Sequence, residues 1–317
     1  MVSKKNKFDL VSIGGATVDL SFYSKEGELI SAGKPASQKM LAFEYGAKIV
    51  ADRVYTNCGG GASNSAVAAS RLGLKTAVVC RIGNDDNGRL VLKNLKDNKV
   101  ETGLIKIDRQ AATGFSVILT IDNPAKEHIA FIHRGANGEL SANDFIADLP
   151  ANWYYVTSLP ADGWQAIMAK LIKTGKNIVW NPGNEQLKDI GAVKKFLPKI
   201  RLLIINRREA LEFRKLKEIK GLLAYLQGLG PKLAVITNGA NGVYAFDGQK
   251  YYYMKAASSK IINTLGVGDA FGAGLTSALI YDKNIKEALS WGIKNSASVV
   301  REIGAQKGLL TKKEIEK

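Results

Sequence analysis

The sequence predicts an α/β fold with a mostly parallel central sheet and helices on both of its faces. Short apolar runs typical of buried strands alternate with segments of helical period along most of the chain. This repeated β-α order favours a parallel sheet whose connecting helices cover both faces. Two stretches, at about 20–57 and 113–133, break the order and contain strand-like pieces instead, so we also expect a small second sheet.

Size and composition allow one large hydrophobic core. The chain has 317 residues, of which 46% are apolar, enough for a single domain over residues 1–317 with a small appendage. No apolar run approaches the roughly 18 residues that a membrane span requires. The basic start at residues 1–7 leads into an apolar stretch that is too short for a secretory signal. We therefore expect a cytoplasmic protein that does not enter the membrane.

The chain is strongly basic. Lysine and arginine number 45 against 29 acidic residues, which gives a net charge of +16. Such a protein attracts anions, including nucleic acid and phosphorylated metabolites. The basic residues are spread along the chain without a long tract or an aromatic RNA-binding motif, so nucleic-acid binding is not expected. The two cysteines and two histidines do not form a familiar zinc-binding spacing.

The predicted elements follow one another in a regular order. An apolar strand at 8–15 comes first, and a helix follows at 64–72, with Asn64 as its expected N-cap and Gly73 as its stop. The later elements are expected at 76–82 (strand), 87–96 (helix), 153–157 (strand), 164–173 (helix), 177–180 (strand), 192–197 (helix), 202–205 (strand), a helical stretch up to 226, and 233–237 (strand). A hairpin is expected at 243–246 and 251–255.

The two irregular stretches predict an antiparallel flap, or lid, with segments at about 20–57 and 113–133. The second stretch carries alternating apolar residues that would share one face: Phe115, Val117, Leu119 and Ile121. The alternation resumes at Ile129 after a predicted turn at Asp122-Asn123-Pro124, and His128 and His133 flank this run as lid residues. An apolar sheet face must be covered. We expect it to cover a substrate or a second subunit.

The strongest chemical feature is the glycine-rich stretch 263–274, which opens a helix of small and apolar residues. Closely spaced glycines at a helix start leave amide N–H groups unshielded, and these groups, with the helix dipole, bind phosphate. Asp269 lies in this stretch, where a carboxylate would repel a ligand that is only held as an anion. It fits there if it accepts a proton from an attacking hydroxyl while the amides hold a phosphoryl group. A plain glycine-rich turn is the alternative.

Two weaker features accompany it. In the segment 59–69, glycines allow a ligand to touch the backbone, and the amide of Asn64 can both donate to and accept from hydroxyls. Close helix–sheet packing would also explain its small residues. Asp19 is expected to close the first strand, at the strand end where ligands bind in parallel sheets. A carboxylate there can bind two sugar hydroxyls, although an ordinary loop aspartate would look the same.

Together these residues resemble the PfkB-type, ribokinase-like carbohydrate kinases over nearly the whole chain. Two signatures of that family occur in the expected order: the glycine segment 59–69 continuing through 81–88, and Gly266-Val267-Gly268-Asp269. Smaller matches are Asp19, Thr113-Gly114, Gly135-Ala136-Asn137, Asn181-Pro182, Asn206-Arg207-Arg208-Glu209 and Thr237-Asn238-Gly239. The resemblance implies a three-layer α/β/α ribokinase-like fold with a small β-sheet lid. It also implies ATP-dependent phosphorylation of a hydroxyl of a small sugar or nucleoside.

The resemblance further implies roles for individual residues. Asp269 matches the catalytic base, and the matching anion hole consists of Gly266, Val267 and Gly268. The substrate-binding residues would be Asp19, Gly59, Gly60 and Asn64. The nucleotide site would include Asn181, Asn206, Glu209, Thr237 and Gly239, with Glu209 linked indirectly to Mg²⁺. The lid of this family often forms a dimer contact, which implies a homodimer through the lid.

The sequence also departs from the family pattern. Asn263-Thr264 replaces the usual Asp-Thr, whose aspartate belongs to the monovalent-cation site of potassium-activated members, so K⁺ use is not implied. The first signature reads Gly-Gly-Gly-Ala-Ser-Asn where ribokinase has Gly-Gly-Lys-Gly-Ala-Asn. No acidic or amide residue of the kind that many ribokinases carry follows Thr157-Ser158-Leu159-Pro160 at the matching position. Ribose, fructose, a sugar acid and a nucleoside all stay open as acceptors.

Two other functions compete with a kinase. A nucleotide-dependent oxidoreductase would use Gly268-x-x-x-Gly272-x-Gly274 and the pair Tyr251 and Lys255, but both occur late in the chain and in the wrong order for a dinucleotide fold. A catalytically degenerate sugar- or nucleotide-binding protein is the second alternative, and the presence of Asp269, Asn206 and Glu209 counts against it. The sequence contains no Walker A motif.

Overall fold

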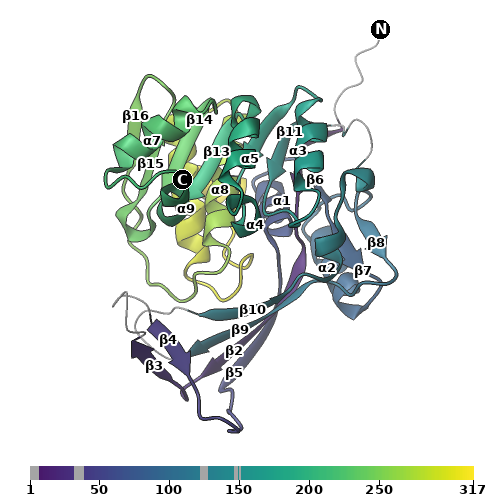
Figure 1. The fold of residues 1–317 in the computed structure, drawn as a ribbon. Coiled ribbons are helices and arrows are strands. Elements are labelled where there is room, and N and C mark those ends of the chain that lie inside the picture. The colour runs from purple at the N-terminus through teal and green to yellow at the C-terminus, as the bar shows by residue number, and fades with distance from the viewer. Residues whose placement is uncertain (1–6, 32–38, 122–127, 146–148, 150) are drawn as a thin grey trace.

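The computed structural model describes residues 7–31, 39–121, 128–145, 149 and 151–317. Its largest element is an eight-stranded sheet with the order β16-β15-β14-β13-β12-β11-β1-β6 (Figure 1). The strands are β1 (Phe8–Ile13), β6 (Thr76–Val79), β11 (Ala151–Val156), β12 (Asn177–Trp180), β13 (Leu202–Asn206), β14 (Leu233–Thr237), β15 (Val243–Phe246) and β16 (Tyr251–Met254). Only β15 runs antiparallel to its two neighbours. The predicted mostly parallel sheet is confirmed.

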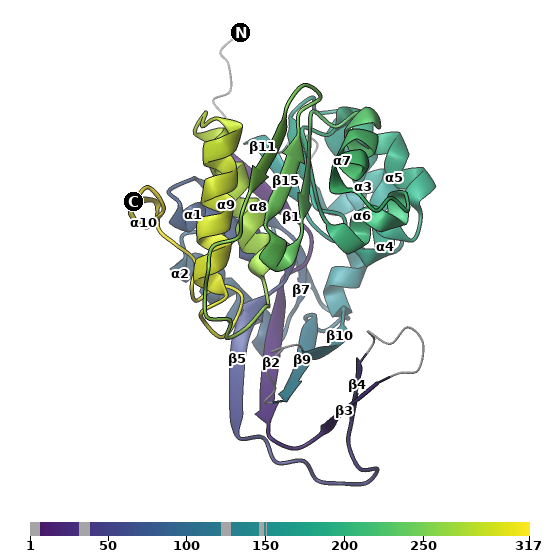
Figure 2. The same ribbon diagram turned by 90° about the vertical axis from the view of Figure 1, so that its left-hand side faces the viewer.

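Helices cover both faces of this sheet (Figure 2). One face carries α3 (Trp164–Ile172), α4 (Asn184–Leu187), α5 (Ile190–Phe196), α6 (Arg207–Phe213) and α7 (Ile219–Gly228). The other side carries α1 (Gly61–Arg71), α2 (Asp86–Asp97), α8 (Val267–Ile280), α9 (Ile285–Val299) and α10 (Lys312–Ile315). Tyr154 and Tyr155 of β11 are both fully buried, each in the core on one side. Burial on both faces explains why the strands read as continuous apolar runs.

None of the helices in the described ranges is long and apolar enough to cross a bilayer. A short parallel pair, β7 (Arg81–Gly83) and β8 (Lys106–Asp108), lies beside α2 at the edge of the molecule. The helix α8, near the C-terminus, packs against α9 and against α1, which contains most of the glycine segment 59–69. The two family signatures, about 200 residues apart in sequence, therefore meet in space.

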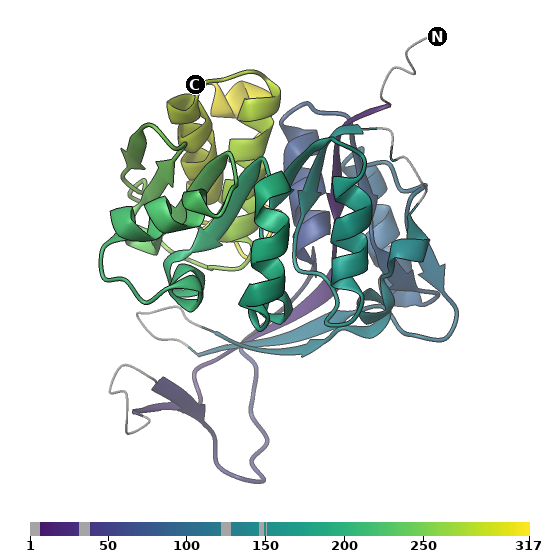
Figure 3. The same cartoon turned by 45° about the horizontal axis from the view of Figure 1, so that its top comes forward.

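A second sheet forms a lid at one end of the core sheet (Figures 1 and 3). Its strand order is β10-β9-β2-β5, with β2 (Thr17–Ser24), β5 (Arg53–Gly59), β9 (Phe115–Ile121) and β10 (Ile129–His133). A further pair, β3 (Glu28–Ser31) and β4 (Lys39–Ala42), lies at its tip. The lid is not purely antiparallel as expected, since β2 and β9 run parallel. These two strands arrive from distant parts of the chain, so no hairpin links them.

The apolar face of β9, expected to cover a substrate or a second subunit, is the outer face of the lid. Ser116 and Ile118 of β9 line the pocket under the lid. On the other face, the side chain of Phe115 is 38% exposed, and that of Phe131, its diagonal neighbour on β10, is 64% exposed. Ser116 and Ile118 share the opposite face, which meets the pocket, so of the two expected roles the apolar face does not cover a substrate there, and its covering by a second subunit stays a prediction. The predicted turn at 122–124 lies outside the described residues.

Two predicted positions also change. The strand β1 ends at Ile13, and Asp19 is the third residue of the lid strand β2, so it does not close the first strand. The helix α1 begins at Gly61 with Gly60 as N-cap at φ 87°, so Asn64 is not the N-cap. Its backbone N–H is already bonded to the Gly60 carbonyl at 2.8 Å, which leaves its side chain free to enter the pocket. Gly73 ends the helix at φ 90°, as expected.

Candidate active site

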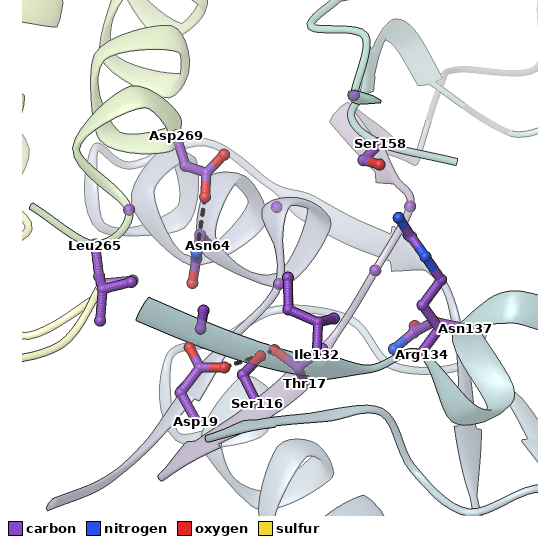
Figure 4. Close-up of a pocket in the computed structure, with 18 of the residues that line it drawn as sticks. Thr17, Asp19, Asn64, Ser116, Ile132, Arg134, Asn137, Ser158, Leu265 and Asp269 are labelled. Atoms are coloured by element: carbon purple, nitrogen blue, oxygen red, sulfur yellow. Dashed lines mark hydrogen bonds between the residues drawn. The ribbon is translucent and has the colours of Figure 1, made fainter. Parts of the chain in front are cut away.

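A pocket of about 470 Å³ lies between the lid and the carboxyl ends of β1, β11 and β12 (Figure 4). This volume suits a small metabolite. The turns after β1, β11 and β12, the lid strands with the turn after β10, and the starts of α1 and α8 contribute most of its lining. Most of the predicted substrate residues line it, namely Asp19, Gly60 and Asn64, together with Gly266 and Asp269.

Asp269 is the third residue of α8 and points into this pocket. The side-chain amide of Asn64 donates a hydrogen bond from Nδ2 to Asp269 Oδ2 at 2.8 Å. Burial raises the pKa of the Asp269 carboxyl, the nearby Asp19 charge raises it further, and the hydrogen bond from Asn64 opposes both effects. A carboxylate with a raised pKa is a stronger proton acceptor than an ordinary surface aspartate.

Asp19 faces the same space from the lid. Thr17 Oγ1 donates to Asp19 Oδ1 at 3.2 Å, and burial raises the pKa of Asp19, opposed by hydrogen bonds from Ser116 and Thr17. Gly59, on the neighbouring strand β5, does not line the pocket itself. A Cβ at Gly59 would overlap the Asp19 carboxylate. The glycine thus provides the room that the carboxylate occupies.

The start of α8 is an open amide cradle. Gly266 adopts the left-handed conformation at φ 68°, and the first intrahelical hydrogen bond runs from Ala270 N to Gly266 O at 2.8 Å. The N–H groups of Val267, Gly268 and Asp269 therefore have no partner within the helix. Apart from its neighbours along the helix, no described heavy atom lies within 4 Å of a Cβ built on Gly268. An anion such as a phosphoryl group fits this position, where the helix dipole also favours it.

Val267 packs against the hydrophobic cluster that α1 and α2 form with β6. The valine side chain therefore extends into the core, and its backbone amide stays at the start of the helix.

The side chain of Asn263 makes two hydrogen bonds: its Nδ2 donates to Tyr23 Oη at 2.9 Å, and its Oδ1 accepts from Leu265 N at 2.7 Å. This buried neutral amide offers no charge to a monovalent cation.

The residues expected around the nucleotide follow three neighbouring strands, away from the pocket of Asp269. Asn181 follows β12 and donates from Nδ2 to the Ile204 carbonyl at 2.9 Å. Asn206 and Glu209 cap α6 reciprocally, with Glu209 N to Asn206 Oδ1 at 2.9 Å and Asn206 N to Glu209 Oε2 at 2.8 Å. Thr237 ends β14, and Gly239 follows it. The five residues lie at or shortly after the carboxyl ends of these strands, and none of them lines the 470 Å³ pocket.

A magnesium ion would have to rely on few protein ligands. Among the residues that the structure describes, no group of three histidine, cysteine or acidic side chains could hold a metal ion. Burial raises the pKa of Glu209, and its bonds to Asn206 oppose this rise. Mg²⁺ commonly keeps several waters and binds through one or two carboxylates and substrate phosphates. Glu209, with Oε2 engaged in the helix cap, fits such an indirect role.

Sequence reasoning missed several polar residues of the site, including Ser116, Arg134 and Gln306. Ser116 and Arg134 line the pocket from β9 and from the end of β10. Gln306 lies behind it and donates from Nε2 to Asn64 Oδ1 at 2.9 Å, which fixes the Asn64 amide with its NH₂ toward Asp269. Arg134 directly precedes the Gly135-Ala136-Asn137 match and could have been found there. Gln306 has no local signal, because its contact spans 242 positions.

The dehydrogenase-like glycines have a structural explanation. Gly272 and Gly274 lie inside α8. A Cβ on Gly272 would overlap Tyr155 Oη, and a Cβ on Gly274 would lie 2.8 Å from the carbonyl oxygen of Trp291. They allow close packing of the helix on the sheet and on α9. Tyr251 belongs to β16 at the edge of the core sheet, not to a helix beside a glycine-rich turn. The arrangement of a dinucleotide fold is therefore not reproduced.

A lid over a polar pocket, and a carboxylate at the amide-lined start of a helix, define a class of small-molecule phosphotransferases. The chain belongs to the pfkB family of carbohydrate kinases, whose model matches residues 8–312.

The relatives it resembles act on different acceptors. An ATP-dependent 6-phosphofructokinase of Thermoanaerobacterium thermosaccharolyticum is 24% identical, over 90% of this chain and 91% of the relative. A 5-dehydro-2-deoxygluconokinase of Bacillus licheniformis is 23% identical, over 99% and 96%. The structure of a Burkholderia thailandensis nucleoside kinase in complex with inosine has a TM-score of 0.79 at 17% identity, covering 96% of both chains. A ribokinase structure from Thermotoga maritima matches with a TM-score of 0.79 at 20% identity, covering 98% of both chains, and this match establishes the ribokinase-like fold.

Proposed function

We propose that this protein transfers the γ-phosphoryl group of ATP to a hydroxyl of a small sugar or nucleoside, with Asp269 as the general base. One observation carries the proposal. Asp269 lies at the amide-lined start of α8 and shares a pocket with Asp19 and Asn64. Proton acceptor, phosphoryl cradle and hydroxyl-binding groups are thus within one small volume, as in-line transfer requires.

In this mechanism the acceptor lies under the lid, with its hydroxyls bound by Asp19. Asp269 accepts the proton of the attacking hydroxyl, and Asn64 holds the carboxylate in place through its 2.8 Å hydrogen bond. The amides from Gly266 to Gly268 stabilise negative charge on the transferring group. The lid limits water, which would otherwise compete as the acceptor.

The nucleotide would extend from this cradle along the ends of β12, β13 and β14. This is supported by five residues that lie at or shortly after the carboxyl ends of these neighbouring strands: Asn181, Asn206, Glu209, Thr237 and Gly239. Mg²⁺, when bound, supplies charge neutralisation between the phosphates. Glu209 would orient its water shell, since a carboxylate oxygen remains outside the α6 cap.

The lid would also form the contact of a homodimer, with residues 1–317 as one domain in each subunit. Support comes from the outer lid face, where Phe115, Ile129 and Phe131 are 38%, 38% and 64% exposed, and Val54 of β5 is 50% exposed. Apolar residues gathered on one sheet face mark an interaction surface. Sedimentation of the purified protein, and of a Phe131→Lys variant, would measure this association.

The proposed function is tested by replacing Asp269 with asparagine. The variant should fold and lose about 10² to 10⁴ in turnover, the usual size of a general-base effect. Because burial raises the pKa of Asp269, the ionised carboxylate costs folding free energy, so thermal stability at neutral pH should not fall. Asp162→Asn, at an exposed position away from the pocket, is the matched control. Near-normal phosphorylation by a folded Asp269→Asn protein would reject the proposal.

A further inference from the structure

Arg134 gives the pocket a positive end. It follows β10 directly, and its side chain lines the pocket. In Figure 4 its guanidinium lies on the side of Ser158, across the pocket from Asp269 and Asp19. The two carboxylates and the guanidinium thus occupy opposite ends of one cavity. A ligand that spans it meets negative charge at the reacting end and positive charge at the other.

The charge of Arg134 is only partly compensated by the protein. Its Nη2 lies 3.4 Å from Glu185 Oε1, while Glu185 Oε2 accepts from Lys188 Nζ at 2.8 Å. One carboxylate is therefore shared between two cations, and the closer contact belongs to the lysine. Within the described part of the chain, Arg134 has no other acceptor among the recorded hydrogen bonds. Most of its five N–H donors stay available to a ligand.

The neighbouring groups leave room at this end. A Cβ on Gly183 would overlap Ser158 Oγ, so the absence of a side chain there keeps the hydroxyl accessible beside Arg134. Gly183 and Ser158 both line the pocket. A planar guanidinium next to a hydroxyl donor matches the oxygens of a carboxylate or a phosphate, which arginine binds with two parallel hydrogen bonds.

A neutral polyol would not use this cation. The two carboxylates can bind the hydroxyls of a polyol, but they repel an anionic ligand unless its charge lies at the far end. We propose that the acceptor carries an anionic group, a carboxylate or a phosphate monoester, opposite the hydroxyl that reacts, and that Arg134 binds this group. The inference rests on the proposed kinase function and narrows its acceptor class to acidic or phosphorylated sugars.

The test compares matched acceptors. Five- and six-carbon sugars are each supplied as the neutral sugar, as the aldonic acid and as a phosphate monoester, and ATP-dependent product formation is measured. The wild type should have a lower KM for one of the anionic forms than for its neutral parent. The form that is preferred distinguishes a carboxylate from a phosphate. Arg134→Ala should raise the KM for that form about 10- to 100-fold, the usual effect of losing a charge-assisted hydrogen bond.

Other readouts separate recognition from general damage. The KM for the neutral sugar and the kcat should change less than about threefold in Arg134→Ala, and Arg134→Lys should recover part of the affinity, because lysine keeps the charge without the planar fork. Arg89→Ala removes the same charge from the exposed surface of α2, outside the pocket, and should change nothing. A wild type that prefers neutral acceptors, or an unchanged preference in Arg134→Ala, would overturn the proposal.

A binding measurement distinguishes failure of this inference from failure of the proposed kinase function. If none of these acceptors and no nucleoside is phosphorylated, the proposed function fails, and isothermal calorimetry with the same aldonic acids and sugar phosphates still decides the role of Arg134. Binding by the wild type that Arg134→Ala loses would support the anionic site. No binding, or equal binding by both proteins, would reject it.

Discussion

The side-chain amide of Asn64 donates a hydrogen bond to Asp269 Oδ2 at 2.8 Å and joins two helices that begin 206 residues apart, α1 at Gly61 and α8 at Val267. This contact ties the glycine segment to the proposed base. It also lowers the pKa of a carboxyl that burial and Asp19 raise.

The acid limb of the pH–rate profile should report Asp269. The base must be ionised, so kcat/KM falls as the pH drops through the pKa of Asp269. Burial and the Asp19 charge raise this pKa, which sets the limb above the ordinary value of about 3.9. Asp19→Asn removes the like charge and should move the limb to lower pH. An unchanged limb, or one that moves to higher pH, would contradict the coupling.

Gln306 should act as a positioning residue. Gln306→Leu removes the donor to Asn64 Oδ1 and lets the Asn64 amide turn away from Asp269. We expect kcat to fall about tenfold, in line with a lost hydrogen bond of about 1–1.5 kcal/mol. The diagnostic readout is the acid limb of the pH profile of kcat/KM. This limb should move to higher pH, because Asp269 loses a hydrogen bond that lowers its pKa. Gln249→Leu, on an exposed turn, is the control. A lower kcat with an unmoved limb would indicate general damage instead.

Potassium should not activate this protein. The amide of Asn263 is buried and hydrogen-bonded at both ends, to Tyr23 and Leu265, and it lacks the negative charge that attracts a cation. Turnover measured with K⁺ should equal turnover with tetramethylammonium at the same ionic strength, within about twofold. Activation by more than this margin that saturates with K⁺ would show that another group serves as the cation site.

Gly272 and Tyr155 should be coupled in stability. A Cβ at Gly272 would overlap Tyr155 Oη, so Gly272→Ala should lower the free energy of unfolding by about 1–3 kcal/mol, the usual cost of overpacking. Within the described residues, Tyr155 Oη has no hydrogen-bond partner, and Tyr155→Phe alone should therefore change stability little.

The double variant provides the check on this coupling. Gly272→Ala in the Tyr155→Phe background should cost clearly less than in the wild type, as measured by urea denaturation in a double-mutant cycle. Equal costs in both backgrounds would mean that the helix cannot accept a side chain there for another reason.

Local features carried most of what the sequence predicted correctly. The glycines around Asp269 mark a helix start, and the buried strands show as apolar runs, so the core fold and the open amide start of α8 follow from neighbouring residues. Asp19 and Asn64 do line the pocket, although one lies on a lid strand and the other inside a helix.

The parts that were missed depend on long-range packing. Both faces of β9 carry apolar residues, so the alternation around Ile118 could not tell which face meets the pocket. Gln306 reaches Asn64 across 242 positions. Arg134 and Glu185 come from different layers of the fold, the lid and α4. Single-sequence periodicity contains no information about such pairs.

The connection between β1 and the lid is only three residues long, Gly14 to Ala16, and Asp19 follows it almost immediately. Asp269, by contrast, belongs to the body of the molecule. A rotation of the lid relative to the body would change the separation of the two carboxylates and so the repulsion between them. The proton affinity of the proposed base would then depend on lid angle: Asp269 would be a weaker base with the lid open than with it closed, which would restrain hydrolysis of ATP before an acceptor is enclosed.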